Sequence, residues 1–335
     1  MKKQKLFHFG ICLSLILILL ILLSLSIGDS SFSIHVVWDC LFGKASPAMT
    51  FIITKIRLPR ILACLFGGAS LALAGNLLQT LTRNPLADSG ILGINAGAGF
   101  MIALLISHGK GDNSLNMAFL PFLATLGALL TLVLVYMASL SKQKTIQPTA
   151  LIITGVGFSM MLSSLMIAVV GHVNRYKVDY VLNWLSGRII GDDWNAILLT
   201  APLLVLLWGF TYSKSYTLNI LLLSDDMATA LGMNVQRERK IILALATCLA
   251  AISVTLIGNI TFIGLIAGHV SRYFIGDDHR LNLPLSLLLG MIFLLLADTL
   301  TRVFLVGSNI PTGIIISLLG APYFLYLMQE KPKKS

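Results

Sequence analysis

Long apolar runs separated by short polar segments make up most of this chain. The hydrocarbon core of a bilayer needs about 20 apolar residues per helix, and shorter runs suffice only where neighbouring helices bury them. Ten runs approach this length, at residues 6–27, 60–81, 91–106, 116–139, 149–170, 195–212, 241–257, 260–275, 283–305 and 310–328. The pattern therefore predicts an all-α, polytopic membrane protein with about ten transmembrane helices.

Composition agrees with this prediction. Of the 335 residues, 56% are hydrophobic and 11% are charged, whereas a soluble domain has about 25% charged residues. The net charge of +10 is explained by basic loops on the inner side of a membrane, and it does not indicate a nucleic-acid partner. The four cysteines show no CxxC or Cys/His spacing, so neither a disulfide framework nor a metal site is indicated.

The basic residues also predict the topology. With the N-terminus inside, 15 of the 24 Lys and Arg residues fall in inner segments, and both termini are basic and cytosolic. The first apolar run exceeds the roughly 7 to 15 residues of a signal peptide's hydrophobic region and has no A-x-A site after it, which favours a retained span. Spans two to five and seven to ten then run in opposite directions, as in inverted-repeat transporters. No clear residue-level repeat accompanies this arrangement, and no linker divides the 1–335 transmembrane domain.

Two segments are expected outside the membrane. Residues 28–59 form a long external loop, and residues 179–194 contain Trp184 and Trp194, which suit the headgroup level. The second segment is a re-entrant helix, a surface helix or an ordinary loop.

The stretch from Ser224 to Lys240 interrupts the apolar pattern with charges of both signs. Ser224, Asp225 and Asp226 favour a helix start, and Gly232 favours its end. A second helix restarts at Val235. Residues 213–240 thus form a short helical projection on the cytosolic side, which is either a docking surface for a partner or a solvated connector.

Enzyme signatures are lacking. The sequence has no HExxH or GxSxG motif and no GxxxxGK[ST] phosphate loop, so active transport requires a motor on another polypeptide. An ion-coupled carrier would keep ionisable groups within the membrane. Only Asp298, four residues before Arg302, approaches that description, and this spacing also suits a structural ion pair.

Several separated motifs resemble, over nearly the full length, the FecCD-type permeases of ABC importers for iron-siderophores, haem and cobalamin. They are IRLPR (56–60), GGASLALAGNLLQTLTRNPLADSGILGINAGAG (67–99), ALGMNVQRER (230–239), FIGLIAGHVSR (262–272), DDHR (277–280) and IPTGIIISLLGAPYFLYL (310–327). The LGINAGAG and PYFLYL segments look most like iron-siderophore members, hydroxamate-type among them.

The resemblance implies a permease subunit that passes an intact ferric-siderophore across the cytoplasmic membrane. It implies a second permease, identical or paralogous, and two ATP-binding-cassette ATPases that use ATP and Mg, with no cofactor on this chain. An extracytoplasmic siderophore-binding protein would deliver the chelate. A haem or cobalamin permease, or a secondary carrier without an ATPase, remains the alternative.

The resemblance also assigns roles to residues. It implies an ATPase-coupling function for Asp225, Asp226, Met227, Ala228, Leu231 and Gly232. Arg57, Arg60 and Arg302 would dock acidic residues of the binding protein, and headgroup contact is the alternative for them. Side chains that either line the pathway or join helices are Asn76, Gln79 and Asn95, and the resemblance implies a gate at Pro148 and Thr149. Asn84-Pro85 predicts a turn, with the next helix starting at Asp88.

Overall fold

The fold is given by a computed structural model, which describes residues 2–27, 34–90, 92–108, 120–140, 148–171, 175–189, 194–304 and 310–329. Within these residues the secondary-structure elements are helices, which confirms the all-α class. In chain order they are α1 (Lys2–Ser26), α2 (Ile34–Leu41), α3 (Pro47–Phe51), η1 (Ile52–Arg57), α4 (Leu58–Thr82), α5 (Ile94–His108), α7 (Leu120–Ser139), α8 (Pro148–Val170), α9 (Arg175–Leu185), α10 (Trp194–Ser213), α11 (Ser215–Leu221), α12 (Asp225–Ala230), α13 (Val235–Ile257), α14 (Ile263–Ile275), α15 (His279–Phe304) and α16 (Thr312–Gln329).

Each of the ten predicted spans coincides with a helix. Among the described residues, eight helical segments are long and apolar enough to cross a membrane. The remaining two spans are α5, with 15 residues, and α14, with 13. Helix α9 shows that the first part of the segment before α10 is helical and not an ordinary loop.

The expected external loop at residues 28–59 is largely helical where the structure describes it. Ser46 caps α3 and Pro47 occupies its first turn, and α3, η1 and α4 continue as one 36-residue helical segment. At about 1.5 Å per residue this segment is longer than the roughly 30 Å hydrocarbon core. The loop prediction was wrong because Lys55, Arg57 and Arg60 interrupt the apolar pattern without breaking the helix.

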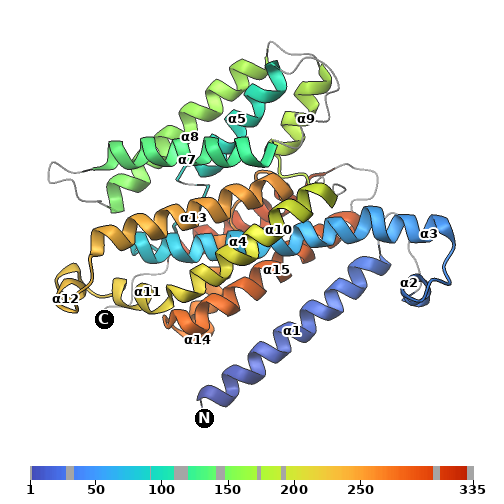
Figure 1. Cartoon of the computed structure of the whole chain (residues 1–335), viewed down its shortest axis with the longest axis horizontal. Helices are drawn as coiled ribbons and strands as arrows, with labels where there is room; N and C mark the ends of the chain where they lie inside the picture. Colours follow the sequence, from blue (N-terminus) through green and yellow to red (C-terminus); the bar gives the residue numbers. More distant parts are fainter. Residues whose placement is uncertain are drawn as a thin grey trace.

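The long helices lie side by side along the longest axis of the molecule, with α2 at one end and α12 at the other (Figure 1). We call these the α2 end and the α12 end. Phe9, near the start of α1, packs against Phe274 at the end of α14, with ring centroids 4.8 Å apart. Thr312, at the start of α16, contacts Asp298 near the α2 end. The N-terminal end of α1 and the C-terminal end of α16 therefore both lie toward the α12 end (Figure 1).

The packing shows an inverted repeat of α4, α5, α7 and α8 with α13, α14, α15 and α16. Helices α4 and α13 are antiparallel neighbours at the centre; α4 packs on α14 and α15 of the second half, and α13 packs on α5 and α7 of the first. A short sequence match accompanies this symmetry. The residues from Leu92 to Gly97 (LGINAG) correspond to those from Ile263 to Gly268 (IGLIAG), with glycine, alanine and glycine in common.

The segment that follows α4 in the first half contacts the segment that precedes α14 in the second half. Helix α4 ends before Arg83, which has φ 50°, and α14 begins after Phe262, which has φ 69°. The Asp88 carboxylate accepts a hydrogen bond from the Phe262 backbone N–H at 3.4 Å. Asp88, from a distant part of the chain, thus contacts the residue that precedes α14. The prediction that it starts the next helix was wrong, because α5 begins at Ile94.

Candidate coupling surface and arginine cluster

Local sequence determines both ends of α12. The Ser224 hydroxyl accepts a hydrogen bond from the Met227 N–H at 3.3 Å, as an N-cap residue does. At the other end Gly232 has φ 84°, and the N–H of Met233 bonds to the Ala228 carbonyl at 3.1 Å, which forms a Schellman-type stop. Helix α13 restarts at Val235 behind the Asn234 cap. The predicted start, stop and restart are confirmed.

Ion pairs fasten α12 to the bundle. Asp225 Oδ1 accepts hydrogen bonds from Arg83, just after α4, and from Arg239 on α13, each at 2.8 Å. Lys214 and Glu238 form a further pair at 2.8 Å between the end of α10 and α13. The two Asp225 contacts join α12 to the end of α4 and to α13. The sequence does not reveal the role of Arg83, because it lies 142 residues before Asp225.

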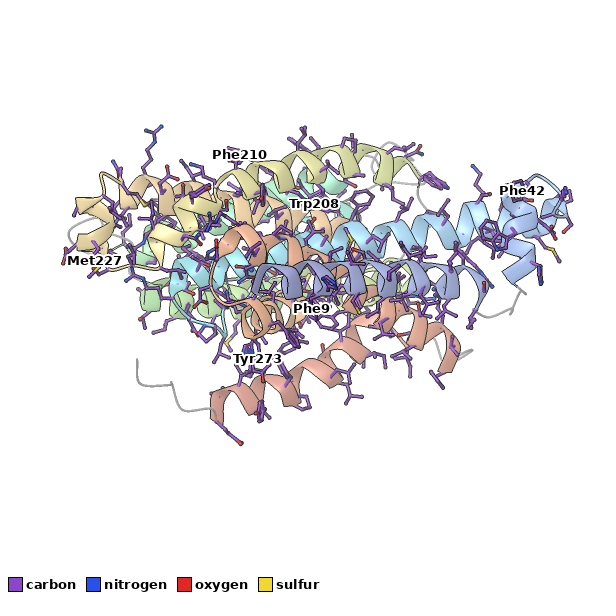
Figure 2. The ribbon with its side chains drawn as sticks, turned by 90° about the horizontal axis from the view of Figure 1, so that it is seen from below. Phe9, Phe42, Trp208, Phe210, Met227 and Tyr273 are labelled. Atoms are coloured by element: carbon purple, nitrogen blue, oxygen red, sulfur yellow. The ribbon has the colours of Figure 1, made fainter. Side chains whose placement is uncertain are left out.

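The six predicted coupling residues divide into two groups. Ala228 is 1% exposed, and Asp225 is bound to the two arginines, so these two side chains connect α12 to its own chain. Asp226 and Gly232 are exposed, as are Met227 (59%) and Leu231 (64%). We call these last four residues the coupling surface. Figure 2 shows Met227 at the far end of the molecule from Phe42 of the α2 end.

The turn between α14 and α15 also contributes to the α12 end, because it is bonded to α11. Asn219 of α11 donates a hydrogen bond to Asp278 and accepts one from the His279 N–H, both at 2.8 Å. Arg280 bonds to the same carboxylate, and this contact holds the pKa of Asp278 well below its usual range. The DDHR motif thus anchors α11, which connects α10 to α12.

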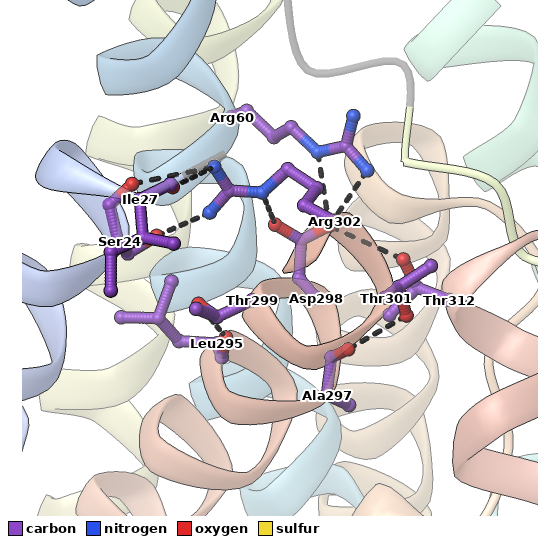
Figure 3. A network of polar contacts seen from close by, with 10 residues as sticks. All are labelled: Ser24, Ile27, Arg60, Leu295, Ala297, Asp298, Thr299, Thr301, Arg302 and Thr312. Atoms are coloured by element: carbon purple, nitrogen blue, oxygen red, sulfur yellow. Dashed lines mark hydrogen bonds and ion pairs between the residues drawn. The ribbon is translucent and has the colours of Figure 1, made fainter. Parts of the chain in front are cut away.

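The three predicted docking arginines lie near the α2 end, and Figure 3 shows two of them, Arg60 and Arg302, around the buried Asp298 carboxylate. Arg60 of α4 donates two hydrogen bonds to Asp298 Oδ1, at 2.8 and 3.0 Å, and Arg302 donates one to Oδ2 at 3.0 Å. Arg57 is buried and bonds to the Leu25 carbonyl. Only Arg60, at 28%, keeps a substantially exposed side chain. Docking stays a prediction for all three, and in this structure Arg57 and Arg302 are engaged inside the chain.

The predicted pathway side chains join helices in this structure. Asn76 donates to Asn282 and Ser286 of α15, at 2.8 and 3.0 Å. Gln79 donates to the Gly264 carbonyl of α14 at 3.4 Å, and Asn95 donates to Asn259 at 3.0 Å. A lining role stays a prediction for these side chains. Of the predicted gate residues, Pro148 begins α8, and Thr149, which follows it, is exposed.

Comparison with known proteins identifies this arrangement. Residues 16–330 match the FecCD transport family. The chain belongs to the FecCD family. It is 40% identical to the iron(3+)-hydroxamate import system permease protein FhuG of Bacillus subtilis, over 86% of this chain and 87% of that protein. It is also 36% identical to the Fe(3+) dicitrate transport system permease protein FecD of Escherichia coli, over 88% of this chain and 91% of the relative.

A solved structure extends the likeness to three dimensions. It is an inward-facing conformation of an ABC transporter assigned to the metal-chelate type, with a TM-score of 0.82 and 30% identity, over 99% of this chain and 100% of the other. This FecCD chain is accordingly the membrane-embedded permease subunit of an ABC importer, with ATP hydrolysis on a separate chain. It is a multi-pass protein of the cytoplasmic membrane, and it works with ATPase and substrate-binding partners.

Proposed function

We propose that this permease carries an intact ferric siderophore of the hydroxamate type into the cytoplasm. The proposal is supported by the relatives: the hydroxamate permease is 40% identical, and the two ferric citrate permeases of Bacillus subtilis and Escherichia coli are 37% and 36% identical. The complex would contain two permease subunits, two ATPases that use ATP and Mg, and an external siderophore-binding protein. The α12 end faces the ATPases, and the α2 end faces the binding protein.

The observation that carries the ATP-driven part of this proposal is the coupling surface. Met227 and Leu231 are exposed on a helix that two ion pairs fix at the α12 end. The projection lies beyond the long apolar helices, so lipid does not cover these two side chains. An apolar helix face that is held rigidly is suited to enter a groove on a partner. Asp226, one residue before Met227, gives this surface a polar rim.

The test of coupling is Leu231→Asp in the full importer. A carboxylate at the centre of an apolar contact must lose its hydration, so we expect the variant to lose ATPase binding and uptake while its amount in the membrane is unchanged. Leu281→Asp is the matched control, because Leu281 is also an exposed leucine near the α12 end but belongs to α15. If Leu231→Asp still purifies with the ATPase and transports at the normal rate, the coupling surface is wrongly assigned.

The substrate is tested by uptake of radioactive iron into cells that depend on this importer. Ferric hydroxamates are expected to be taken up, and ferric citrate to be taken up poorly. Uptake of haem or cobalamin in their place would contradict the proposed substrate. Uptake that survives inactivation of the ATPase but stops when the ion gradient is dissipated would contradict the ATP-driven mechanism.

A further inference from the structure

Asp298 lies in a polar cluster that joins four helices (Figure 3). This carboxylate is 0% exposed, and it lies on α15. It accepts hydrogen bonds from Arg60 of α4, from Arg302 one turn further along α15 and, at 3.2 Å, from the Thr312 hydroxyl at the start of α16. Arg302 extends the cluster to α1. The network therefore ties α1, α4, α15 and α16 together near the α2 end.

The contact with α1 satisfies the free carbonyl groups of its last turn. Arg302 donates to the carbonyls of Ser24 and Ile27, at 3.3 and 3.4 Å, and also to the Ser24 hydroxyl. Arg57 donates to the carbonyl of Leu25. The last carbonyls of a helix lack partners within it and carry partial negative charge. Guanidinium groups of η1 and α15 therefore cap α1, and Asp298 orients one of them.

The cluster holds helix ends that have modest packing elsewhere. Among the helices, α16 packs on α15 and less extensively on α14, and α1 packs chiefly on α15. The start of α16 is also joined to Gly187 by one backbone hydrogen bond at 3.1 Å. Because most of the polar bonds of the cluster cross between helices, separating the helix ends would break several of them together.

We propose that Asp298 is the centre of a latch that keeps the α2 end closed. The similar solved structure is in an inward-facing conformation, and a transporter open to one side must be closed at the other. In the transport cycle, opening of the α2 end requires Arg60 and the start of α16 to leave Asp298. Arg60 is suited to this exchange, because its side chain is already 28% exposed to solvent. Asp298 is thus a positioning residue of the gate, with no contact to the transported chelate.

The latch rests on the proposed function only for the direction of transport, so it can be tested without any substrate. Cys64 is the natural reporter, because it lies one helical turn from Arg60 on the same face of α4 and is 0% exposed. The full chain would carry Cys12→Ala, Cys40→Ala and Cys248→Ala and would be assayed in right-side-out membrane vesicles. The reaction rate of Cys64 with impermeant methanethiosulfonates reports opening of the α2 end.

We expect Asp298→Asn to raise the labelling rate of Cys64 about tenfold or more. The substitution also makes the cluster more positive, which by itself accelerates an anionic reagent and slows a cationic one. The 2-sulfonatoethyl and 2-trimethylammonioethyl reagents are therefore compared. Opening of the latch raises both rates, and Asp298→Glu should return them toward the original value. Loss of the carboxylate also favours the reactive Cys64 thiolate, which raises both rates without opening, so opening is inferred only if the uncharged substitution Thr312→Val raises them as well. Unchanged rates, or a rise with the anionic reagent alone, would overturn the proposal.

Two threonine variants that leave the charge of the cluster unchanged also test whether the cluster closes the α2 end, including in the case that Asp298→Asn does not accumulate in the membrane. Thr312→Val removes one bond to Asp298 without a change of charge, and we expect it to raise the Cys64 rate severalfold. Thr301→Val is the matched control, because the Thr301 hydroxyl is bonded to the Ala297 carbonyl of its own helix at 2.7 Å. Equal labelling rates in these two variants would show that the contact with α16 does not close the α2 end.

Discussion

Gly75 and Gly157 lie within long helices, but their surroundings differ. A Cβ atom on Gly75 would lie 2.5 Å from the Cα of Gly264 on α14, whereas a Cβ on Gly157 would meet nothing within 4 Å. Small residues let membrane helices approach closely, so the first glycine is required for packing and the second is not.

We therefore expect Gly75→Ala to destabilise the permease by about 1 to 3 kcal/mol, because the added methyl group forces the two backbones apart. Gly157→Ala should leave stability unchanged or raise it slightly, since alanine favours a helix over glycine by about 1 kcal/mol. The measurement is the temperature at which the detergent-solubilised chain loses its monodisperse size-exclusion peak. Equal losses in the two variants would contradict the close packing of α4 and α14.

The arginines near the α2 end differ in how far their side chains are exposed to solvent. Arg60 is partly exposed, whereas Arg57 is buried against the end of α1. An exposed ion pair contributes up to about 1 kcal/mol, so we expect Arg60→Gln to weaken capture of the binding protein about two- to fivefold when capture is expressed per folded permease. Arg57→Gln should instead lower the amount of folded permease. Pull-down and membrane quantification distinguish the two effects. Normal capture by Arg60→Gln would argue against docking at this residue.

The element α12 shows which parts of the site a sequence can predict. Its ends depend on Ser224 and Gly232, which act on neighbouring backbone groups, so local sequence was sufficient. Its position depends on Arg83 and Arg239, and the first of these is distant in sequence. A single sequence contains no signal for such a pairing. For the same reason Asp298 could be paired with Arg302, four residues away, but not with Arg60.

Asp225 provides the test of how α12 is held. Asp225→Asn removes the charge that both arginines share while the coupling surface is preserved. We expect the importer to keep ATPase binding but to transport less chelate per ATP hydrolysed, because a loosened α12 transmits less of the motor's movement. The ratio of transport to hydrolysis in proteoliposomes measures this, and Asp225→Glu should restore part of it. An unchanged ratio would mean that the ion pairs are not needed for coupling.

At the scale of the whole molecule, hydropathy was sufficient to place a helix in each predicted span, whereas the topology expected from charge stays a prediction. All ten predicted spans contain a helix. The inverted repeat was expected from span directions alone, and the packing of α4 and α13 on the opposite halves supplies what the sequence lacks. The break after α4 was expected from Asn84-Pro85, whereas the way the following segment meets the start of α14 was less predictable. Their geometry depends on the contact between Asp88 and Phe262, which are 174 residues apart.

The sidedness of the whole molecule yields the last prediction. The first variant keeps Cys40 of α2 and has the other three cysteines replaced by alanine. If the α12 end is cytosolic, Cys40 should react with an impermeant maleimide in right-side-out vesicles. Asp226→Cys, in a chain without other cysteines, should react only in inside-out vesicles. Both positions are at least partly exposed, so a difference in labelling reports the side and not burial. The reason for the orientation is the excess of Lys and Arg in the segments at the α12 end. Labelling of both positions from the same side would contradict the topology, and with it the placement of the ATPase and the binding protein at opposite ends.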